Sequence, residues 1–514
     1  MKRREFIKNL GMVTGAGAVT FSIAGIPIKA FAKPFMNIQS TNGKILVLIQ
    51  LKGGNDGLNT IIPLDQYSSY ISKRPVIGVA ETAAVKLTNQ TGMHPSLLPL
   101  KQLYDEGKFT VIQNVGYSNP NRSHFRSTDI WLSASDYNQF LYDGWVGRYL
   151  LKAFPNYPNT PPPHPMAIQI GSVQSGVFDS TQGGLAVSFN NPDEFYTLVS
   201  GISADTDPPP ATLAGVELKF LKEVASLSVQ YASVIKEKAD IGNPVANYTA
   251  GGTFGSQLKI IVDLILGGLT TPVYLATMDG FDTHSNQTVA NSHPLLLTRL
   301  AESIKAFQSD LEKYGLADKV VILTFSEFGR RVNENASGGT DHGTAAPMLL
   351  VGKNVQGGIF GSNASLTDLD NNGDIKFKVD FRQIYASILK DHFGMTTNEV
   401  DNILIKHFDT IPIIKAATGV ENDYELPNEF ALKQNYPNQF NPATKIEYSL
   451  REPGDVKLFV YDLLGKKIAT LVDSFQSAGS YSVNFNGSSL SSGTYFYSIE
   501  TGGQKISKKM ILMK

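Results

Sequence analysis

Ile45-Leu-Val-Leu-Ile-Gln-Leu51, followed by Lys52-Gly-Gly-Asn-Asp-Gly-Leu-Asn-Thr60, is the stretch that decides the fold class. A nearly unbroken apolar run rich in branched side chains is typical of a strand buried on both faces, as in parallel sheets. The Gly-, Asn- and Asp-rich residues behind it are typical of a loop. Further apolar runs of strand length occur at Phe109–Val115, Met166–Ile170, Val273–Met278, Val320–Phe325 and Met348–Val351.

Apolar residues at helical spacing lie between these runs. They occur in Leu213–Ala239, Phe254–Leu266, Pro294–Tyr314 and Phe381–Phe393. Strands that alternate with helices predict an α/β domain whose large, mostly parallel sheet is flanked by helices. We expect this domain to occupy residues 33–425.

The composition excludes several classes of protein. The 514 residues contain 45 Lys and Arg against 46 Asp and Glu, and no Cys. The balanced charge argues against a nucleic-acid partner, because phosphate recognition needs clustered cations. The lack of Cys excludes disulfides, thiol nucleophiles and thiolate metal sites. Catalysis would therefore depend on carboxylates, hydroxyls and the eight His.

The first 32 residues read as an export signal. Arg3 and Arg4 precede an uncharged run over residues 9–28, and Ala30-Phe31-Ala32 offers small residues for cleavage. The Arg3-Arg4-Glu5-Phe6-Ile7-Lys8 string resembles a twin-arginine signal. The run is rich in Gly and Ala, which disfavours a membrane anchor. We expect export to the periplasm and no stable membrane span in the mature protein.

Residues 426–514 begin with a linker, which short aromatic and β-branched runs follow. This pattern predicts a small all-β sandwich. The runs are separated by Gly465, Gly479, Gly487 and Gly493. The segment resembles the C-terminal sorting domain of the type IX secretion system, through Asn435-Tyr-Pro-Asn438, Phe440-Asn-Pro442 and the basic Lys508-Lys509. The resemblance implies that the export and type IX secretion machineries are partners. It also implies a final location at the cell surface or outside the cell.

Polar residues follow four of the central strands. Asp56 follows the first, Arg122-Ser123-His124 the second, Asp282-Thr283-His284 the fourth, and Asp341-His342 comes shortly after the fifth. The carboxyl ends of parallel strands share one edge of a sheet, where ligands bind. Each motif also has a plain interpretation as a turn, a helix cap or a surface residue. Their joint occurrence favours a site for divalent metal, which needs ligands from separate strands.

The central region resembles the DUF1501 family of exported bacterial proteins and, more distantly, the alkaline-phosphatase-like superfamily. The carrying motifs are LIQLKGGNDGLNTIIP (48–63), NRSHFRSTDIW (121–131), DGWVGRYL (143–150), GFDTH (280–284) and SEFGRRVNENASGGTDHG (326–343). The resemblance implies that Asp56, Asp341 and His342 hold one metal. It further implies that Asp282 and His284 hold or replace a second, and that Ser123 is the nucleophile.

Several assignments stay open beside this resemblance. Arg122, Arg330 or Arg331 could grip nonbridging oxygens of an anionic ester, with Arg122 favoured, and Arg330 and Arg331 could equally be surface ion-pair partners. His124 is a candidate general acid, and His94 and His124 are alternative ligands. One or two ions of Zn²⁺, Mg²⁺ or Ca²⁺ are expected.

The sequence thus predicts an exported, metal-dependent hydrolase of phosphate or related anionic esters. The alternatives are a one-metal, sulfatase-like enzyme and a non-catalytic surface protein that binds a glycan or anionic ligand on the same fold.

Overall fold

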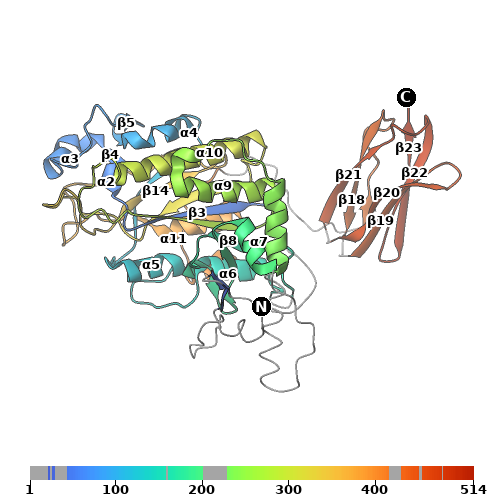
Figure 1. The fold of residues 1–514 in the computed structure, drawn as a ribbon. Coiled ribbons are helices and arrows are strands. Elements are labelled where there is room, and N and C mark those ends of the chain that lie inside the picture. Colours follow the sequence, from blue (N-terminus) through green and yellow to red (C-terminus); the bar gives the residue numbers. More distant parts are fainter. Residues whose placement is uncertain are drawn as a thin grey trace, which may run out of the picture. The chain divides into compact units, whose positions relative to one another are not determined.

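The computed structural model describes residues 21–23, 26–28, 43–157, 160–200, 229–415, 430–450, 454–476 and 479–513 (Figure 1). The chain divides into two units, with the boundary between Ala416 and Ala417. Of the expected signal peptide, β1 (Phe21–Ile23) and β2 (Ile26–Ile28) are described, and they pair antiparallel. The domain boundary expected at residues 425 and 426 lies outside the described residues.

The first unit is built on a nine-stranded, largely parallel sheet. Its strands lie in the order β11 (Ala186–Phe189), β8 (Ala167–Ile170), β12 (Val273–Asp279), β3 (Ile45–Lys52), β13 (Val320–Phe325), β14 (Ala346–Val351), β7 (Phe109–Gly116) and β15 (Gly358–Phe360), with β16 (Val379–Asp380) also paired to β7. Every pair is parallel except the two that β14 makes, with β13 and β7. The predicted fold class and all six predicted strands are confirmed.

Strand β3 shows why the sheet is covered on both faces. Val47 and Ile49 belong to one apolar core, whereas Leu46 and Leu48 belong to another, because successive side chains point to opposite faces. The first core contains α9 (Gly252–Leu266) and α10 (His293–Lys313). The second contains α5 (His124–Ser133), α6 (Trp145–Ala153), α11 (Phe381–Ser387), the π-helical turn η5 (Ile388–His392) and α12 (Thr397–Leu404). Figure 1 shows β3 between α9 and α10 above and α5 and α6 below.

The predicted helices are confirmed where the structure describes them. Helices α9 and α10 and the α11–η5 segment match the three later predictions. Of the stretch predicted from 213 to 239, residues 229–241 form a helix, and residues 213–228 lie outside the described residues. A separate helix, α7, covers Pro192–Ser200. Among the described residues, no helix is both long and apolar enough to cross a membrane.

A small subdomain follows β3 and packs beside the carboxyl edge of the sheet. It contains α2 (Gly57–Thr60), β4 (Ile61–Pro63), η1 (Leu64–Gln66), α3 (Tyr67–Lys73), β5 (Val85–Lys86), β6 (Thr91–Met93), η2 (Pro95–Leu100) and α4 (Lys101–Asp105). Strands β4, β6 and β5 form an antiparallel sheet. Leu58, Ile62 and Tyr70 share a separate core with Val332 and Leu366 from loops beyond β13 and β15. The subdomain thereby fixes the loop that contains Asp56.

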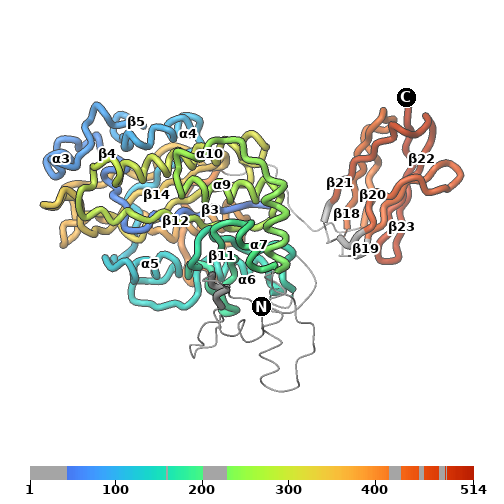
Figure 2. Tube along the Cα trace, viewed as in Figure 1, coloured from blue at the N-terminus to red at the C-terminus, as the bar shows by residue number. Residues whose placement is uncertain are grey.

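The second unit consists of antiparallel strands, as predicted. One sheet joins β17 (Ala431–Leu432), β18 (Ala443–Leu450) and β21 (Gly479–Asn486). The other joins β20 (Lys467–Gln476), β19 (Gly454–Tyr461), β22 (Gly493–Thr501) and β23 (Gln504–Leu512). Side chains from both sheets, including Ile446, Tyr448, Val460, Tyr497 and Ile499, form one buried core. Figure 2 follows the chain through these strands in red.

Candidate metal centre

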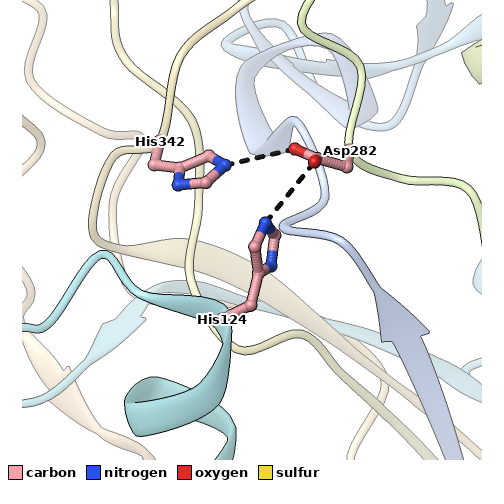
Figure 3. A group of neighbouring side chains, drawn as sticks. All are labelled: His124, Asp282 and His342. Carbon is pink, nitrogen blue, oxygen red and sulfur yellow. Dashed lines mark hydrogen bonds and ion pairs between the residues drawn. The ribbon is translucent and has the colours of Figure 1, made fainter.

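The loops behind β7, β12 and β13 bring three ligand-type side chains together at the carboxyl edge of the sheet. His124 begins α5, Asp282 lies three residues beyond β12, and His342 lies in the loop between β13 and β14. One ligand atom from each lies within 4.8 Å of the other two. His342 Nε2 is 3.1 Å from Asp282 Oδ1, and His124 Nε2 is 3.5 Å from Asp282 Oδ2. Figure 3 shows both imidazoles pointing at the carboxylate.

A fourth side chain completes this group. His284 Nε2 lies 3.1 Å from Asp282 Oδ1 and 2.9 Å from His342 Nε2. We call His124, Asp282, His284 and His342 the exposed cluster, because 46% of the Asp282 side chain is accessible to solvent. It draws on three separate loops, so no short segment of sequence contains the set.

The other ring nitrogen of each histidine already has an acceptor. His124 Nδ1 lies 2.7 Å from Glu327 Oε1, His342 Nδ1 lies 2.9 Å from the Arg122 carbonyl oxygen, and His284 Nδ1 lies 3.2 Å from Asp341 Oδ1. A protonated ring would donate from both nitrogens, to these acceptors and to Asp282, whereas a neutral ring with its N–H on Nδ1 has a lone pair on Nε2. Metal-bound histidines typically have this arrangement.

The ligand atoms of His124, Asp282 and His342 thus lie around one space, and His284 Nε2 lies beside two of them, Asp282 Oδ1 and His342 Nε2. The Nε2 atoms of His284 and His342 would repel each other at 2.9 Å unless a proton or a cation lay between them. A proton on one ring would satisfy that contact, and a divalent ion among His124, Asp282 and His342 would satisfy it as well as their facing ligand atoms. Burial, with the charge of Arg330, lowers the pKa of His342 although its hydrogen bonds to Asp282 and to the Arg122 carbonyl oppose this, which favours a neutral ring. The donor set fits a metal ion.

Arg330 holds the loops of the exposed cluster in place. Its fully buried guanidinium donates to the carbonyls of Gly53, Gly54, Phe281 and Thr340 and to Asp282 Oδ1. Burial raises the pKa of Asp282, but the hydrogen bond and charge of Arg330 outweigh it, so the pKa lies below the usual value. The interpretation of Arg330 as a surface ion-pair partner is wrong, because the loop carbonyls bury it.

Close packing of the β3 loop explains its glycines. Gly53 has φ +122°, and a Cβ there would lie 2.3 Å from the Asp282 backbone nitrogen. Gly54 has φ +80°, and its Cβ would lie 2.4 Å from the Phe328 ring. Only glycine adopts such conformations at little cost and leaves room for this approach. The Gly53-Gly54 pair thus lets the Asp282 loop and the Phe328 ring pack against the β3 loop.

Asp56 lies in a second cluster. Its Oδ2 accepts from Arg74 Nη1 at 2.6 Å and from Gln287 Nε2 at 2.5 Å, and neither the Asp56 nor the Arg74 side chain is accessible to solvent. Arg74 Nη1 also donates to Asn59 Oδ1. We call Asp56, Asn59, Arg74 and Gln287 the buried cluster. Burial raises the pKa of Asp56, but the charge of Arg74 outweighs it, so the pKa is lowered. In this arrangement a guanidinium neutralises Asp56, and no described residue bonds its Oδ1.

The remaining predicted residues surround the exposed cluster. Asp341 Oδ1 accepts from Asn335 Nδ2 at 3.2 Å, which lowers the pKa of Asp341, and it also contacts His284. Ser123 is exposed at the N-terminus of α5, where its side chain makes no capping bond. The guanidinium of Arg122 pairs with the buried carboxylate of Asp374. The structure thus places Asp341 behind a histidine, Ser123 next to a histidine and Arg122 in an ion pair.

Sequence reasoning missed the residues that orient the cluster. Glu327 is buried, and its Oε1 accepts from the Gly53 backbone and contacts His124. Its place directly after a buried strand was a usable signal, because a carboxylate there lies at the ligand-binding edge. Arg74 and Gln287 gave no such signal, since each lies in a polar stretch without a motif.

Comparison with known proteins adds two family matches. Residues 261–404 match DUF1501, described as a protein of unknown function. Residues 434–513 match the secretion system C-terminal sorting domain. Both expected resemblances are confirmed, and the second match indicates type IX secretion to the cell surface or outside the cell. The DUF1501 match contains Asp282, His284 and His342 together with Glu327 and Arg330, whereas His124 precedes it.

Solved structures of low similarity include members and relatives of the alkaline-phosphatase superfamily. A Vibrio parahaemolyticus protein of that superfamily shares 11% identity, with 89% of this chain and 88% of that chain covered and a TM-score of 0.28. A sulfatase from Pseudoalteromonas sp. shares 12%, with 86% and 83% covered and a TM-score of 0.32. A phosphonate monoester hydrolase from Silicibacter pomeroyi shares 8%, with 91% and 88% covered and a TM-score of 0.30. No curated protein matches the chain.

Proposed function

We propose that the protein is a secreted, metal-dependent hydrolase of phosphate or related anionic esters. The observation that supports this most strongly is the exposed cluster, in which ligand atoms of His124, Asp282 and His342 lie within 4.8 Å of one another at a solvent-accessible edge, with His284 Nε2 beside Asp282 and His342. In a purely structural cluster, protein donors would contact such groups, as Arg74 and Gln287 contact Asp56 Oδ2 in the buried cluster. A ligand set left open to solvent is typical of a catalytic metal site.

The donor set favours one ion of Zn²⁺ or a similar transition metal. Imidazole nitrogen suits zinc and its neighbours, whereas Mg²⁺ and Ca²⁺ prefer oxygen. His124, Asp282, His284 and His342 would hold the ion, and Glu327 and Asp341 would orient two of the histidines. This arrangement supports the one-metal alternative over two metals, and it moves His124 from general acid to ligand. Asp341 becomes a positioning residue, and Asp56 is part of the scaffold.

A bound ion would neutralise the ester's negative charge and favour ionisation of a nearby hydroxyl. We propose that the Ser123 Oγ attacks the phosphorus or sulfur atom. The Ser123 hydroxyl loses its proton as the new bond forms, the bond to the leaving alcohol breaks and the alcohol oxygen gains a proton. Water later hydrolyses the phosphoryl or sulfuryl ester of Ser123, which frees phosphate or sulfate and restores the hydroxyl. Ser123 precedes a proposed ligand in the chain and its side chain is exposed, which suits this role. The charge of Arg331 acts on Asp341, and Arg331 makes no ion pair with a described residue within 4.0 Å, so it is a better candidate than the buried Arg330 to contact the ester's free oxygens.

The test is hydrolysis by the full chain after loading with Zn²⁺, Mn²⁺ or Mg²⁺. Substrates are 4-nitrophenyl phosphate, bis(4-nitrophenyl) phosphate and 4-nitrophenyl sulfate. We expect turnover of at least one ester, loss of turnover in Asp282→Ala, and no loss in Asp318→Ala, whose carboxylate makes a surface pair with Lys353. Bound metal without turnover of any ester would reject the enzyme and support a non-catalytic binding protein.

Ser123 is tested separately. Ser123→Ala should abolish the burst of product that a covalent intermediate gives and lower kcat by about 1,000-fold or more, as removal of a nucleophile does. Unchanged turnover in this variant would assign the attack to water and leave the metal-dependent function intact.

We also propose a route for export. Residues 1–32 would direct the folded chain to the periplasm, residues 33–425 would form the enzyme, and residues 426–514 would address it to type IX secretion. Deletion of residues 426–514 should leave the protein in the periplasm, and Arg3→Lys/Arg4→Lys should keep it in the cytoplasm. Fractionation with an antibody to the first unit measures both, and surface display of either variant would contradict the route.

A further inference from the structure

Phe328 is a buried aromatic residue that packs against the exposed cluster. It follows Glu327 directly in the loop behind β13 and is 2% exposed. It belongs to none of the four apolar cores that the described residues form. Its ring centroid instead lies 4.9 Å from that of His124 and 4.6 Å from that of His342. Because a buried phenyl ring normally belongs to an apolar core, this position points to a role in the cluster.

The hydrogen bonds of these two imidazoles leave part of their orientation undefined. His124 Nδ1 contacts Glu327 Oε1, and His342 Nδ1 contacts the Arg122 carbonyl, so a neutral ring is held by one hydrogen bond. The χ2 torsion of histidine has broad minima, and a ring held at one atom can still turn about that contact. Phe328 packs on the two imidazoles at interplanar angles of 44° and 36°, and they pack on each other at 79°. The three rings therefore restrict one another.

The loop behind β3 supports Phe328. Gly54 packs so closely that a Cβ there would lie 2.4 Å from the Phe328 ring. The Gly54 carbonyl accepts from Arg330, whose guanidinium also donates to Asp282. Arg330 thereby joins the loop that supports the phenyl ring to the loop that contains Asp282. The ring has little room to move towards Gly54, so it stays against the imidazoles.

We propose that Phe328 is a positioning residue for the metal ligands. Its ring orients the imidazoles of His124 and His342 so that both Nε2 atoms face Asp282 before an ion binds. The inference rests on the proposed function for the presence of the ion. Ligands that already have their bound orientation lose less conformational freedom on binding, which raises affinity. The phenyl ring also offers no hydrogen-bonding atom that would compete for an Nε2 lone pair.

Zinc affinity tests this role. Phe328→Leu keeps a buried apolar side chain but removes the flat ring. The control is Phe393→Leu, because Phe393 is also buried and packs on an aromatic ring, that of Tyr149 at 4.6 Å, but belongs to the second apolar core. Chelator competition gives the dissociation constants of the full-length proteins. We expect Phe328→Leu to weaken Zn²⁺ binding about tenfold, as loss of a residue that orients ligands does, and Phe393→Leu to stay within about twofold of wild type.

A spectrum separates positioning from a general loss of stability. Co²⁺ replaces Zn²⁺ in the same full-length proteins, and its visible absorption depends on the geometry of its ligands. We expect Phe328→Leu to change the spectrum per bound ion and Phe393→Leu to reproduce the spectrum of wild type, although both variants should unfold at a lower temperature. If Phe328→Leu does not fold, Phe328→Met, with a more adaptable side chain, replaces it.

The outcomes distinguish the positioning role from the proposed function. Wild-type metal affinity, or a wild-type Co²⁺ spectrum, in the Phe328 variant would overturn the positioning role and leave the proposed function intact. A wild type that binds no metal would overturn both. Bound metal with the expected changes but without ester turnover would support the positioning role and reject the hydrolase.

Discussion

The exposed and buried clusters lie at the same edge of one sheet but balance their charges differently. In the buried cluster, the guanidinium of Arg74 and the amide of Gln287 donate to the Asp56 carboxylate. In the exposed cluster, the Nε2 atoms of three histidines lie 3.1–3.5 Å from the Asp282 carboxylate. Arg330 also donates to Asp282 Oδ1, so a guanidinium contacts the carboxylate in both clusters, and the exposed cluster differs in the three imidazoles that surround it. Residue type alone does not separate a scaffold carboxylate from a ligand; the partners do.

If this comparison is right, changes to the exposed cluster should affect activity far more than stability. Asp282→Ala removes the carboxylate that all three histidines contact. We expect kcat/KM to fall by about 1,000-fold or more, because a metal supplies several kcal/mol of transition-state stabilisation. Arg330 keeps its four carbonyl acceptors, so thermal unfolding should shift little. A variant that stays active, or that fails to fold, would contradict the comparison.

The buried cluster should show the opposite behaviour. Arg74→Met leaves the Asp56 carboxylate buried without its cation, which should lower the free energy of unfolding by about 3–5 kcal/mol. Asp56→Asn/Arg74→Met should recover part of this loss, because the uncompensated charge is gone. Urea unfolding, followed by a probe in the first unit, measures both. A loss under about 1 kcal/mol in Arg74→Met would mean that water or another group neutralises Asp56.

Buried histidines beside Asp56 give the scaffold a pH dependence. Burial lowers the pKa of His293 and of His94 to about 4. Because the unfolded chain binds these protons below about pH 6.5 and the folded chain does not, stability should fall between pH 6.5 and 4. His293→Gln, which can still donate to Asn55 Oδ1, should flatten this fall by roughly 3 kcal/mol. Parallel stability curves for wild type and variant over this range would refute the prediction.

Substitution of the two carboxylates that contact Nδ1 of the histidines should have the smallest effect on metal affinity. The effect should be larger for the more buried carboxylate. Glu327→Gln should weaken metal binding about 10- to 100-fold, as loss of a charge that orients a ligand does. Asp341→Asn should weaken it less, because the Asp341 side chain is 56% exposed and its contact with His284 is longer, at 3.2 Å. Chelator competition gives both dissociation constants. Equal losses of metal affinity, or a larger loss in Asp341→Asn, would contradict the predicted order, in which Glu327 and its partner His124 contribute more to metal binding than Asp341 and its partner His284.

Much of the fold could be predicted from the local pattern of apolar residues in the sequence. The six apolar runs became strands because both faces of the sheet are covered, as β3 illustrates. The antiparallel direction of β14 could not be predicted, because a buried apolar run has the same sequence pattern in a parallel and in an antiparallel strand. The short strands β5, β9 (Asp179–Ser180), β10 (Gly183–Gly184) and β16 were also missed, because two residues carry no period.

The site was predictable as a location but not as a set of contacts. His342, Asp282 and His284 follow strands that share an edge, and the structure brings them together. Asp56 follows the neighbouring strand, yet Arg74, eighteen positions later, occupies its carboxylate. Nothing in the sequence relates those two positions, because their pairing depends on how the subdomain after β3 folds back. The orienting role of Glu327 likewise depends on a contact with His124, 203 positions away.

Metal content is the most direct test of the central claim that the exposed cluster binds a metal ion. The full chain is loaded with Zn²⁺, passed through a desalting column and analysed by mass spectrometry for metal per chain. We predict about one ion in wild type and in Asp56→Asn, and close to none in His124→Ala/His342→Ala. Equal zinc in wild type and the double variant, or none in wild type, would contradict the account.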